Sequence, residues 1–376
     1  MSSNGVYAQQ DTSSKLHIGF TYPLSTNGRY ARSYSNTFSF HALAGVSKSE
    51  QAFSFAGIAN VIGRDANGFM FSGVATHIGG SARGFQFAGV VNHIRQGTEG
   101  MQFAGFTNVS GAVRGMQVAG FANVSTDTVE GAQLAGFINT ARKAGSQLAG
   151  FTNVARVTEG VQMAGFVNTS KEVKGAQIAG FANVARDVNG TQVAGFINVA
   201  KKVTGVQVAG LINIADSSDY PIGLINIIRH KGEQTLGASI DETGTIWGTF
   251  RSGSRKFYGI LGAGHNPGTG RLRYGLEAGL GAHFPLGWFF RLNTEAVVLS
   301  WTDFEKGAYI RSSVRVFPSM RMGRNLEVFA GPTFNCSGYT NRSSGDPGLR
   351  YNFNKTSGDI FDGINVGAIG GVQLHL

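Results

Sequence analysis

The chain has 376 residues and a net charge of +10, and 42% of its residues are hydrophobic, which is enough to bury a core and excludes a disordered chain. A single cysteine, Cys336, excludes a disulfide scaffold, and the lack of an 18-residue apolar run excludes a membrane protein built from helices. The charge is spread thinly, without interleaved aromatic residues, so nucleic acid is not expected as a partner. Glycine, with 56 residues, is about twice as frequent as its usual ~7% and is poor in helices, so an all-β fold is predicted.

The N-terminal residues 1–14 are interpreted as the remnant of a signal peptide followed by a tail. Val6-Tyr7-Ala8 has the small-x-Ala form of a secretory cleavage site. The apolar segment that normally precedes such a site is missing, so we expect that it was removed or wrongly assigned. A signal peptide places the protein in the cell envelope.

Residues 15–47 are predicted to form the first two strands of a membrane barrel. Between Leu16 and Leu24, apolar residues alternate with His17, Gly19 and Thr21, which is the period of a β-strand with one apolar face. A polar loop and a second strand over 38–46 follow.

Residues 48–231 contain an internal repeat, the unit G-x-Q-x-A-G-F-x-N, in twelve copies spaced about 15 residues apart. Units of this length are too short for helix pairs and fit one β-coil each, so they predict a β-solenoid of about twelve coils inserted in the barrel. Stacked coils place equal residues above one another every ~4.8 Å, so Asn and Phe are expected to form ladders. The predicted ladder residues are Asn108, Asn123, Asn139, Asn153, Asn168, Asn183, Asn198, Phe121, Phe137, Phe151, Phe166, Phe181 and Phe196.

Strict alternation would make both faces of each repeat apolar. We therefore expect a corner at Ala164-Gly165 that turns Met163 and Phe166 inward; otherwise one face must contact lipid or protein. The alternative is that each repeat is a transmembrane strand, giving one wide barrel of about 22 strands that acts as a porin or transport channel. The connectors do not alternate between short and long as membrane barrels require, which favours the solenoid.

Residues 232–376 are predicted to form the eight remaining barrel strands, with apolar residues on one face and glycine or charge on the other. Ten strands in total, an even number, fit an outer-membrane barrel narrow enough for its interior side chains to fill it. If both termini are periplasmic, the repeats leave from the periplasmic mouth. If 38–46 belongs to the solenoid, an even strand number requires 221–229 to be a strand, and the repeats then lie outside the cell, so the side stays open. The predicted lumen charges are Arg271, Arg273, Glu277, Arg291, Glu295, Arg311, Arg315 and Glu327.

The repeats resemble the surface-repeat proteins of leptospires and Bacteroidetes, whose units have the form GLQIGLVN. The stretches 20–28, 44–47 and 250–258 are similar to those of the Bacteroidetes members. The Ala-Gly pair, as at Ala164-Gly165, is one residue longer than the leptospiral form. The resemblance implies an envelope location and no known reaction.

No catalytic motif is present, and no cofactor or enzymatic activity is expected. The carboxylates of the repeats lie in connectors at drifting phases and do not form the facing pair that glycan hydrolysis needs. His77 and His93 should stack on adjacent coils, but two ligands leave a metal site incomplete, so they are only weak candidates. Basic residues in consecutive connectors predict either a stripe for an acidic polymer or a solubilising surface. These residues are Arg142, Lys143, Arg156, Lys171, Lys174, Arg186, Lys201 and Lys202.

The sequence therefore predicts a non-enzymatic protein in the outer membrane of a Gram-negative bacterium, with the solenoid as an interaction or structural module, within a larger complex or alone. The expected partners are outer-membrane lipid, other envelope proteins and lipopolysaccharide or another anionic polysaccharide. The alternatives are the wide transport barrel and a β-helix that binds or cleaves glycans.

Overall fold

A computed structural model describes residues 12–268, 273–302, 308–323, 325–339 and 363–376. The chain divides into two compact units, Met1–Ala185 and Arg186–Leu376. The fold is almost entirely β and combines a β-solenoid of about 13 turns with a closed antiparallel barrel, which confirms the predicted fold class. Among the described residues, no helix is long and apolar enough to span a membrane.

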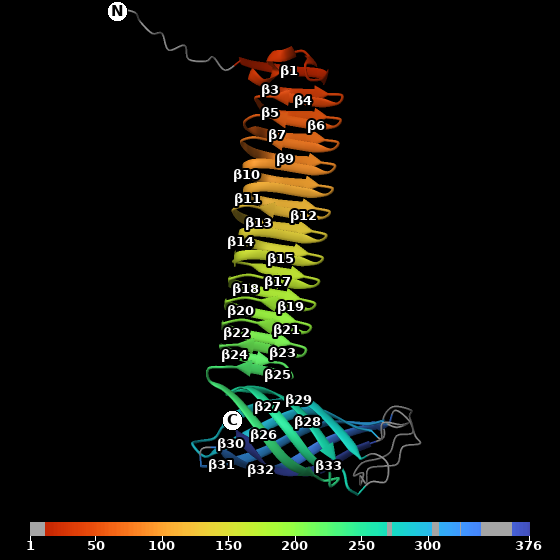
Figure 1. The fold of residues 1–376 in the computed structure, drawn as a ribbon, viewed down its shortest axis with the longest axis vertical. Coiled ribbons are helices and arrows are strands. Elements are labelled where there is room, and N and C mark those ends of the chain that lie inside the picture. The colour runs from red at the N-terminus through yellow and green to blue at the C-terminus, as the bar shows by residue number, and fades with distance from the viewer. Residues whose placement is uncertain (1–11, 269–272, 303–307, 324, 340–362) are drawn as a thin grey trace, which may run out of the picture. The chain divides into compact units, whose positions relative to one another are not determined.

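The first unit is a stack of flattened parallel coils (Figure 1). Each coil has two short strands that lie in opposite walls, with a corner between them and a connector to the next coil. The 3-10 helix η1 spans Gly28–Ser33. The strands are β1 (Thr12–Thr21), β2 (Leu24–Ser25), β3 (Tyr34–His41), β4 (Ala44–Ser47), β5 (Ser49–Ala56), β6 (Ala59–Ile62), β7 (Ala66–Ser72), β8 (Ala75–Ile78), β9 (Ser81–Ala88), β10 (Val91–Ala104), β11 (Thr107–Ala119), β12 (Ala122–Ser125), β13 (Thr128–Ala135), β14 (Ile138–Ala149), β15 (Thr152–Thr158), β16 (Val161–Ala164), β17 (Val167–Thr169), β18 (Glu172–Ala179) and β19 (Ala182–Val184).

The assignment of 15–47 to the barrel is wrong. β1 pairs with β3 in parallel, and β3 pairs with β5 in parallel, so these strands are the first coils of the solenoid. Their alternating pattern suits either architecture, because both present one face inward. The solenoid consequently precedes the barrel and is not inserted into it.

The interior of the coils is polar at its centre. Gln162, Ala164 and Asn168 point inward, whereas Met163 and Phe166 are about 40% exposed. The expected corner at Ala164-Gly165 exists, but it shifts the phase in the direction opposite to the predicted one. Met163 and Phe166 were therefore wrongly expected to face the interior.

Glycines stand at two positions of the repeat, and the one at the corner permits this arrangement. A Cβ on the corner glycine Gly165 would lie 2.1 Å from the Gly150 carbonyl oxygen, so only glycine lets adjacent coils stack there. A second glycine, such as Gly115 with φ 129°, adopts a left-handed conformation inside a strand. It pairs with Gly100 and Gly131 of the neighbouring coils in an unbroken register, and Val113, Gln117 and Ala119 all face inward, so this glycine does not shift the phase of the strand.

The second unit begins with coils of the same kind and continues into the barrel. Its solenoid strands are β20 (Asp187–Ala194), β21 (Ile197–Val199), β22 (Lys202–Ala209), β23 (Ile212–Ala215), β24 (Ser217–Ile222) and β25 (Ile225–Ile228). Its barrel strands are β26 (Gly232–Asp241), β27 (Ile246–Ser254), β28 (Phe257–His265), β29 (Tyr274–Pro285), β30 (Phe290–Thr302), β31 (Ala308–Met322), β32 (Leu326–Tyr339) and β33 (Gly363–His375). The last coil bonds to the barrel, because the Asn226 side chain donates to the Ser252 carbonyl oxygen over 3.1 Å.

The barrel has eight strands, not ten, and closes through β26 and β33. The eight strands predicted within 232–376 are all present. The repeats pair in parallel rather than antiparallel, so they do not add strands to the barrel, and the wide 22-strand barrel is ruled out.

The two ends of the barrel differ in the lengths of their connections. At the end where β26 begins and β33 finishes, the connections are 255–256, 286–289 and 323–325. At the opposite end they are 242–245, 266–273, 303–307 and 340–362. Because β25 leads directly into β26, the solenoid joins the barrel at the end with the short turns.

Candidate functional site

Buried amide ladders hold the coils together. Within the first unit, each ladder asparagine donates to the asparagine of the next coil, over 2.9 Å from Asn153 to Asn168 and 3.0 Å from Asn168 to Asn183. The same Asn153 amide also donates to the Met163 carbonyl oxygen over 2.7 Å. A parallel ladder joins the glutamines, for example Gln162 to Gln147 over 2.8 Å. Because these amides are buried, each unmade bond would leave a polar group without a partner.

The phenylalanine ladder lies on the outside. Ring centroids of successive residues are 4.8 Å apart between Phe106 and Phe121 and 4.7 Å apart between Phe137 and Phe151. We call the column of residues that follow the corner glycines in the first unit the apolar edge. Its members are Ile58, Val74, Val90, Phe106, Phe121, Phe137, Phe151, Phe166 and Phe181, which are 39–50% exposed. The ladder residues Asn198 and Phe196 occupy the same positions in a coil of the second unit.

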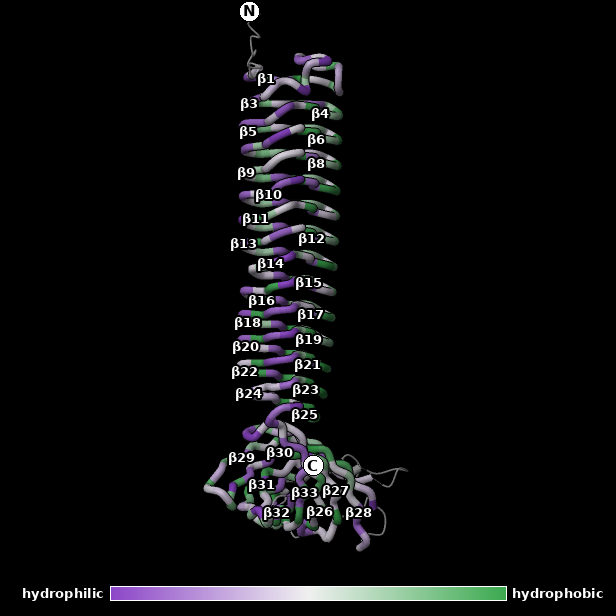
Figure 2. Tube along the Cα trace, turned by 60° about the vertical axis from the view of Figure 1, so that its left-hand side comes forward, coloured by the Kyte–Doolittle hydropathy of each residue, from purple (hydrophilic) through white to green (hydrophobic). Residues whose placement is uncertain are grey.

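The two edges of the coils differ in chemistry. Figure 2 shows hydrophobic residues along the edge that holds the corner glycines and hydrophilic residues along the edge that holds the connectors. Monomeric soluble proteins rarely expose a contiguous apolar patch of more than a few hundred Å². The apolar edge is therefore suited to a partner or to lipid, and the charged edge to water or an ionic ligand.

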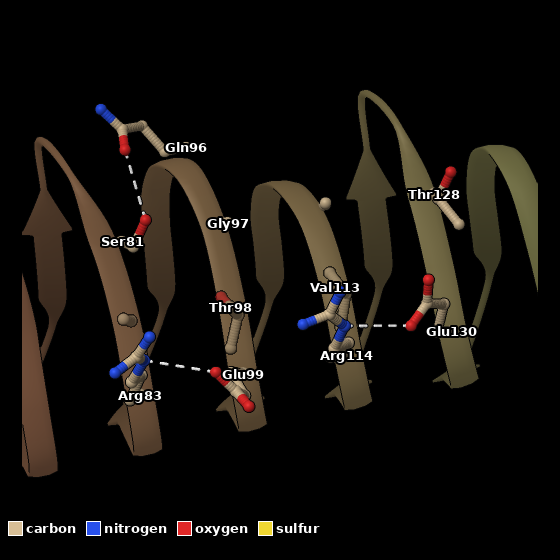
Figure 3. A pocket seen from close by; sticks show the side chains of 12 residues that line it. Ser81, Arg83, Gln96, Gly97, Thr98, Glu99, Val113, Arg114, Thr128 and Glu130 are labelled. Carbon is tan, nitrogen blue, oxygen red and sulfur yellow. Dashed lines mark hydrogen bonds and ion pairs between the residues drawn. The ribbon is translucent and has the colours of Figure 1, made fainter.

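A shallow pocket of about 330 Å³ lies on the charged edge (Figure 3). A column of alternating sign crosses it, and we call Arg83, Glu99, Arg114 and Glu130 the paired column. Arg83 contacts Glu99 over 3.2 Å, and Arg114 contacts Glu130 over 3.0 Å. Both glutamates are exposed and bound to arginine, so the pocket does not present the facing acid and base of a glycosidase.

The basic residues predicted to form a stripe fall into several columns. Arg142, Arg156 and Lys171 lie on consecutive coils at one corner of the first unit, since Arg142 N–H donates to the Asp127 carbonyl oxygen and Lys171 N–H to that of Arg156. We call these three residues the basic column. Lys143 and Lys174 lie outside it and pair with Glu159 and Glu172. In the second unit, Arg186 and Lys201 stack in the same way, with Lys202 beside them.

His77 and His93 stack on adjacent coils, with ring centroids 4.9 Å apart and their Nδ1 atoms 2.8 Å apart. Burial, followed by the charge of His93, lowers the pKa of His77. Across the described part of the chain, no cluster of three or more His, Cys, Asp and Glu residues could hold a metal ion. The two histidines therefore stack as predicted, and no third ligand joins them among the described residues.

The first coils bury a polar cluster that the sequence did not reveal. Glu50 is 1% exposed and accepts hydrogen bonds from Asn36 over 3.1 Å and from Ser39 over 2.9 Å. His17 contacts Asn36 over 3.2 Å and packs edge-on against His41. Glu50 lies in the inward column that later coils fill with small or apolar residues, and this exception within the repeat was the available signal.

The pKa values of this cluster make its stability depend on pH. Burial raises the pKa of Glu50 from 4.5 to about 7, so its contribution is complete below pH ~4.5 and is lost as the pH rises through about 7. Burial, with the charge of His41, lowers the pKa of His17 from 6.5 to about 4, so its contribution is present above pH 6.5 and is lost as the pH falls toward 4. The two effects oppose each other between pH 4.5 and 6.5, and only that of Glu50 remains above this range.

Glu50→Gln is therefore expected to remove the loss of stability between pH 6.5 and 8. At pH 8 the variant should exceed the natural chain by up to about 3 kcal/mol in the local free energy of opening, because the buried charge is gone. Hydrogen exchange of peptides covering 34–56, corrected for intrinsic rates, measures this difference. Glu99→Gln, at an exposed position, is the control and should leave the profile unchanged; a Glu50→Gln profile equal to that of the natural chain would contradict the assignment.

The barrel interior contains a network of ion pairs. Arg315 contacts Glu277 over 2.9 Å, Arg251 contacts Glu295 over 2.8 Å, and Arg291 binds Glu327. Every Asp, Glu and Arg in the described parts of β26–β33 belongs to such a pair; these are Glu233, Asp241, Arg251, Glu277, Arg291, Glu295, Arg311, Arg315, Arg321 and Glu327.

One predicted lumen residue lies outside the network, and another lies outside the described residues. Arg273 is exposed and precedes β29, because that strand begins only at Tyr274, and Arg271 lies outside the described residues. Arg251 and Asp241 were missed, although both stand at polar positions of alternating strands. The predicted remnant over 1–14 also falls mostly outside the described residues.

The sequence matches no protein-family model and no curated protein. One solved structure that it matches is described as "De novo design of transmembrane beta-barrels". The identity is 12%, the match covers 39% of this chain and 94% of that chain, and the TM-score is 0.23. The resemblance to surface-repeat proteins stays a prediction.

Proposed function

We propose that the barrel anchors this protein in the outer membrane of a Gram-negative bacterium and holds the solenoid on the periplasmic side as a non-enzymatic interaction module. The observation that carries the proposal is the distribution of side chains across the barrel wall. Charged side chains of the described strands pair inside, and the outer wall is apolar. This is the arrangement that a β-barrel needs in lipid.

The outer wall offers a continuous apolar surface. The exposed apolar residues of the barrel strands include Leu236, Ile240, Ile246, Leu276, Leu280, Phe284, Val298, Ile310, Val314, Phe334, Ile364, Val366, Val372 and Leu374. A soluble barrel would lose stability by exposing them to water, because apolar surface is favoured in an apolar environment. In a bilayer the same residues contact acyl chains.

An exposed aromatic turn supports a membrane position for the short-turn end. Trp288 is 95% exposed and Phe289 is 65% exposed, in the connection between β29 and β30. Aromatic side chains gather at membrane interfaces, where a large ring meets both lipid and water. This turn would fix the depth of the barrel in the bilayer.

The lengths of the connections support the periplasmic side. Outer-membrane barrels have short turns in the periplasm and longer loops outside. The short turns lie at the end where Gly232 continues from the solenoid, and Leu376 N–H bonds to the Gln234 carbonyl oxygen at the same end. Both the solenoid and the C-terminus would then be periplasmic.

The apolar edge supports the interaction role. Its stacked side chains are rigid, and rigid apolar surface is what a partner can cover at a low entropic cost. A transport role for the barrel has less support, because large side chains such as Trp247, Trp301 and Arg315 are buried in its interior.

Cysteine labelling in cells that make the full chain tests the anchor and its orientation. In a Cys336→Ser background, we expect Gly268→Cys, in the 266–273 connection, to react with a membrane-impermeant maleimide in intact cells. Thr204→Cys, in the solenoid, should react only after the outer membrane is permeabilised. The chain should also fractionate with the outer membrane and migrate faster on a gel before boiling than after it.

Two results would contradict the proposal. Equal labelling of Thr204→Cys in intact cells would put the solenoid on the cell surface. Recovery in the soluble fraction, without a mobility shift on boiling, would show that the barrel is not a membrane anchor.

A further inference from the structure

The basic column forms no ion pair with a carboxylate in the part of the chain that the structure describes, although Asp127 lies one coil before Arg142. Arg142, Arg156 and Lys171 are exposed, and no carboxylate among the described residues pairs with any of them. Adjacent coils are ~4.8 Å apart, so three like charges stand in single file at close range. Like charges on neighbouring strands are destabilising, so the arrangement needs a compensating interaction.

Another column of the same solenoid shows how charges on stacked coils can be neutralised. In the paired column, arginine and glutamate alternate from coil to coil, and each arginine contacts a glutamate of the next coil. A ladder of that kind neutralises itself. The basic column lies on the coils that follow, and after Asp127, which precedes Arg142, no acidic residue alternates with its three cations, so they are left for an anion from outside the chain.

We propose that the basic column binds a linear acidic polysaccharide that carries a carboxylate on successive sugar residues. This inference names a partner for the interaction module and rests on the proposed function. A sugar residue in an extended glycan is about as long as one coil is high, so successive carboxylates can meet successive cations. Guanidinium groups bind carboxylates through paired hydrogen bonds, which suits the two arginines.

Neighbouring residues favour this occupant over nucleic acid. Ala141, Ala155 and Ser170 precede the three cations and Lys143, Val157 and Glu172 follow them, so no aromatic residue adjoins them in the chain on which a base could stack. Phosphates of a duplex also lie along two strands across a groove, which a single file of cations does not match.

Neighbouring residues also favour it over an anionic membrane. Glu159 and Glu172 lie in the same connectors, paired with Lys143 and Lys174. A flat anionic surface would press against these glutamates as well as the cations, and the repulsion would offset much of the gain. A narrow chain can follow the basic column and avoid them.

Binding of polygalacturonate to the purified full chain in detergent tests the inference. The triple variant Arg142→Gln, Arg156→Gln, Lys171→Gln should weaken binding roughly tenfold to a hundredfold at 0.15 M salt, since each cation contributes on the order of 1 kcal/mol. The matched control Arg83→Gln, Arg114→Gln, Lys143→Gln removes equal charge from cations that already have partners, and should stay within about twofold of the natural chain.

The unliganded variants provide a second readout. Removing the basic column relieves repulsion, so its variant should unfold at the same temperature as the natural chain or higher. Equal binding by the triple variant and the natural chain would overturn the proposal, as would an equal loss in the control. Tighter binding of duplex DNA, anionic lipid vesicles or neutral dextran than of polygalacturonate would also overturn it.

The mobility shift of the same samples before and after boiling separates this inference from the proposed anchor. If the gel shift is normal but polygalacturonate does not bind, only the proposed glycan partner is wrong. If the natural chain shows no gel shift, the proposed membrane anchor is wrong.

Discussion

Glu295→Leu is expected to destabilise the barrel by about 3–5 kcal/mol, the usual result of removing one partner from a buried ion pair. Glu295 is buried and accepts hydrogen bonds from Arg251 Nε over 2.8 Å and from Tyr258 Oη over 3.0 Å, and it lies 3.5 Å from Arg315. Leucine would leave Arg251 in the interior without its carboxylate. The measurement is the temperature at which the compact gel band is lost, together with urea unfolding in detergent.

Two variants control this experiment. Glu295→Gln keeps hydrogen-bond acceptors without the charge and should have a smaller effect than leucine. Val298→Leu, which faces outward on the same strand, should change stability by less than about 1 kcal/mol. An unchanged transition in Glu295→Leu would show that the interior pairs do not hold the barrel closed.

Asn153→Leu is expected to open the solenoid locally and to lower its stability by about 3–6 kcal/mol. The side chain donates to Met163 and Asn168 and accepts from Asn139, over 2.7, 2.9 and 3.0 Å. Each of two or three buried groups left without a partner costs about 1–3 kcal/mol. Hydrogen exchange of peptides covering 139–168 should accelerate, with a smaller effect on coils farther along the stack.

The outward position beside it serves as the control. Phe151→Leu keeps an apolar side chain on the exposed edge of the same coil and should lower stability by about 1 kcal/mol or less, through the loss of ring stacking. If Phe151→Leu were as destabilising as Asn153→Leu, the stability of the coils would depend on their exterior and not on the amide ladders.

The repeat could be predicted from the sequence because its residues recur at a fixed spacing along the chain. Glutamine, asparagine and glycine recur every 15 residues or so, and stacking coils at that period places Asn153 above Asn139 and Phe151 above Phe137. The basic column follows by the same logic, since Arg142 and Arg156 stand in equal positions of consecutive copies.

Which side chains of a coil face its interior could not be predicted in the same way. The corner glycine turns the chain between two walls of the coil, and strict alternation takes no account of that turn. Phe166 therefore lies outside and Gln162 inside, although hydrophobicity alone suggests the reverse. The raised pKa of Glu50 likewise depends on its burial between coils.

Local pattern by itself determined three features of this protein: the β class, the period of the solenoid and the eight alternating strands of the barrel, because each is written in the spacing of neighbouring residues. Tertiary structure alone decided that β1 and β3 join the coils rather than the barrel, since parallel and antiparallel partners demand the same alternation along a strand. It also decided which charges are neutralised, because Arg251 meets Glu295 across the barrel, 44 residues away, whereas no carboxylate among the described residues forms an ion pair with the cations of the basic column.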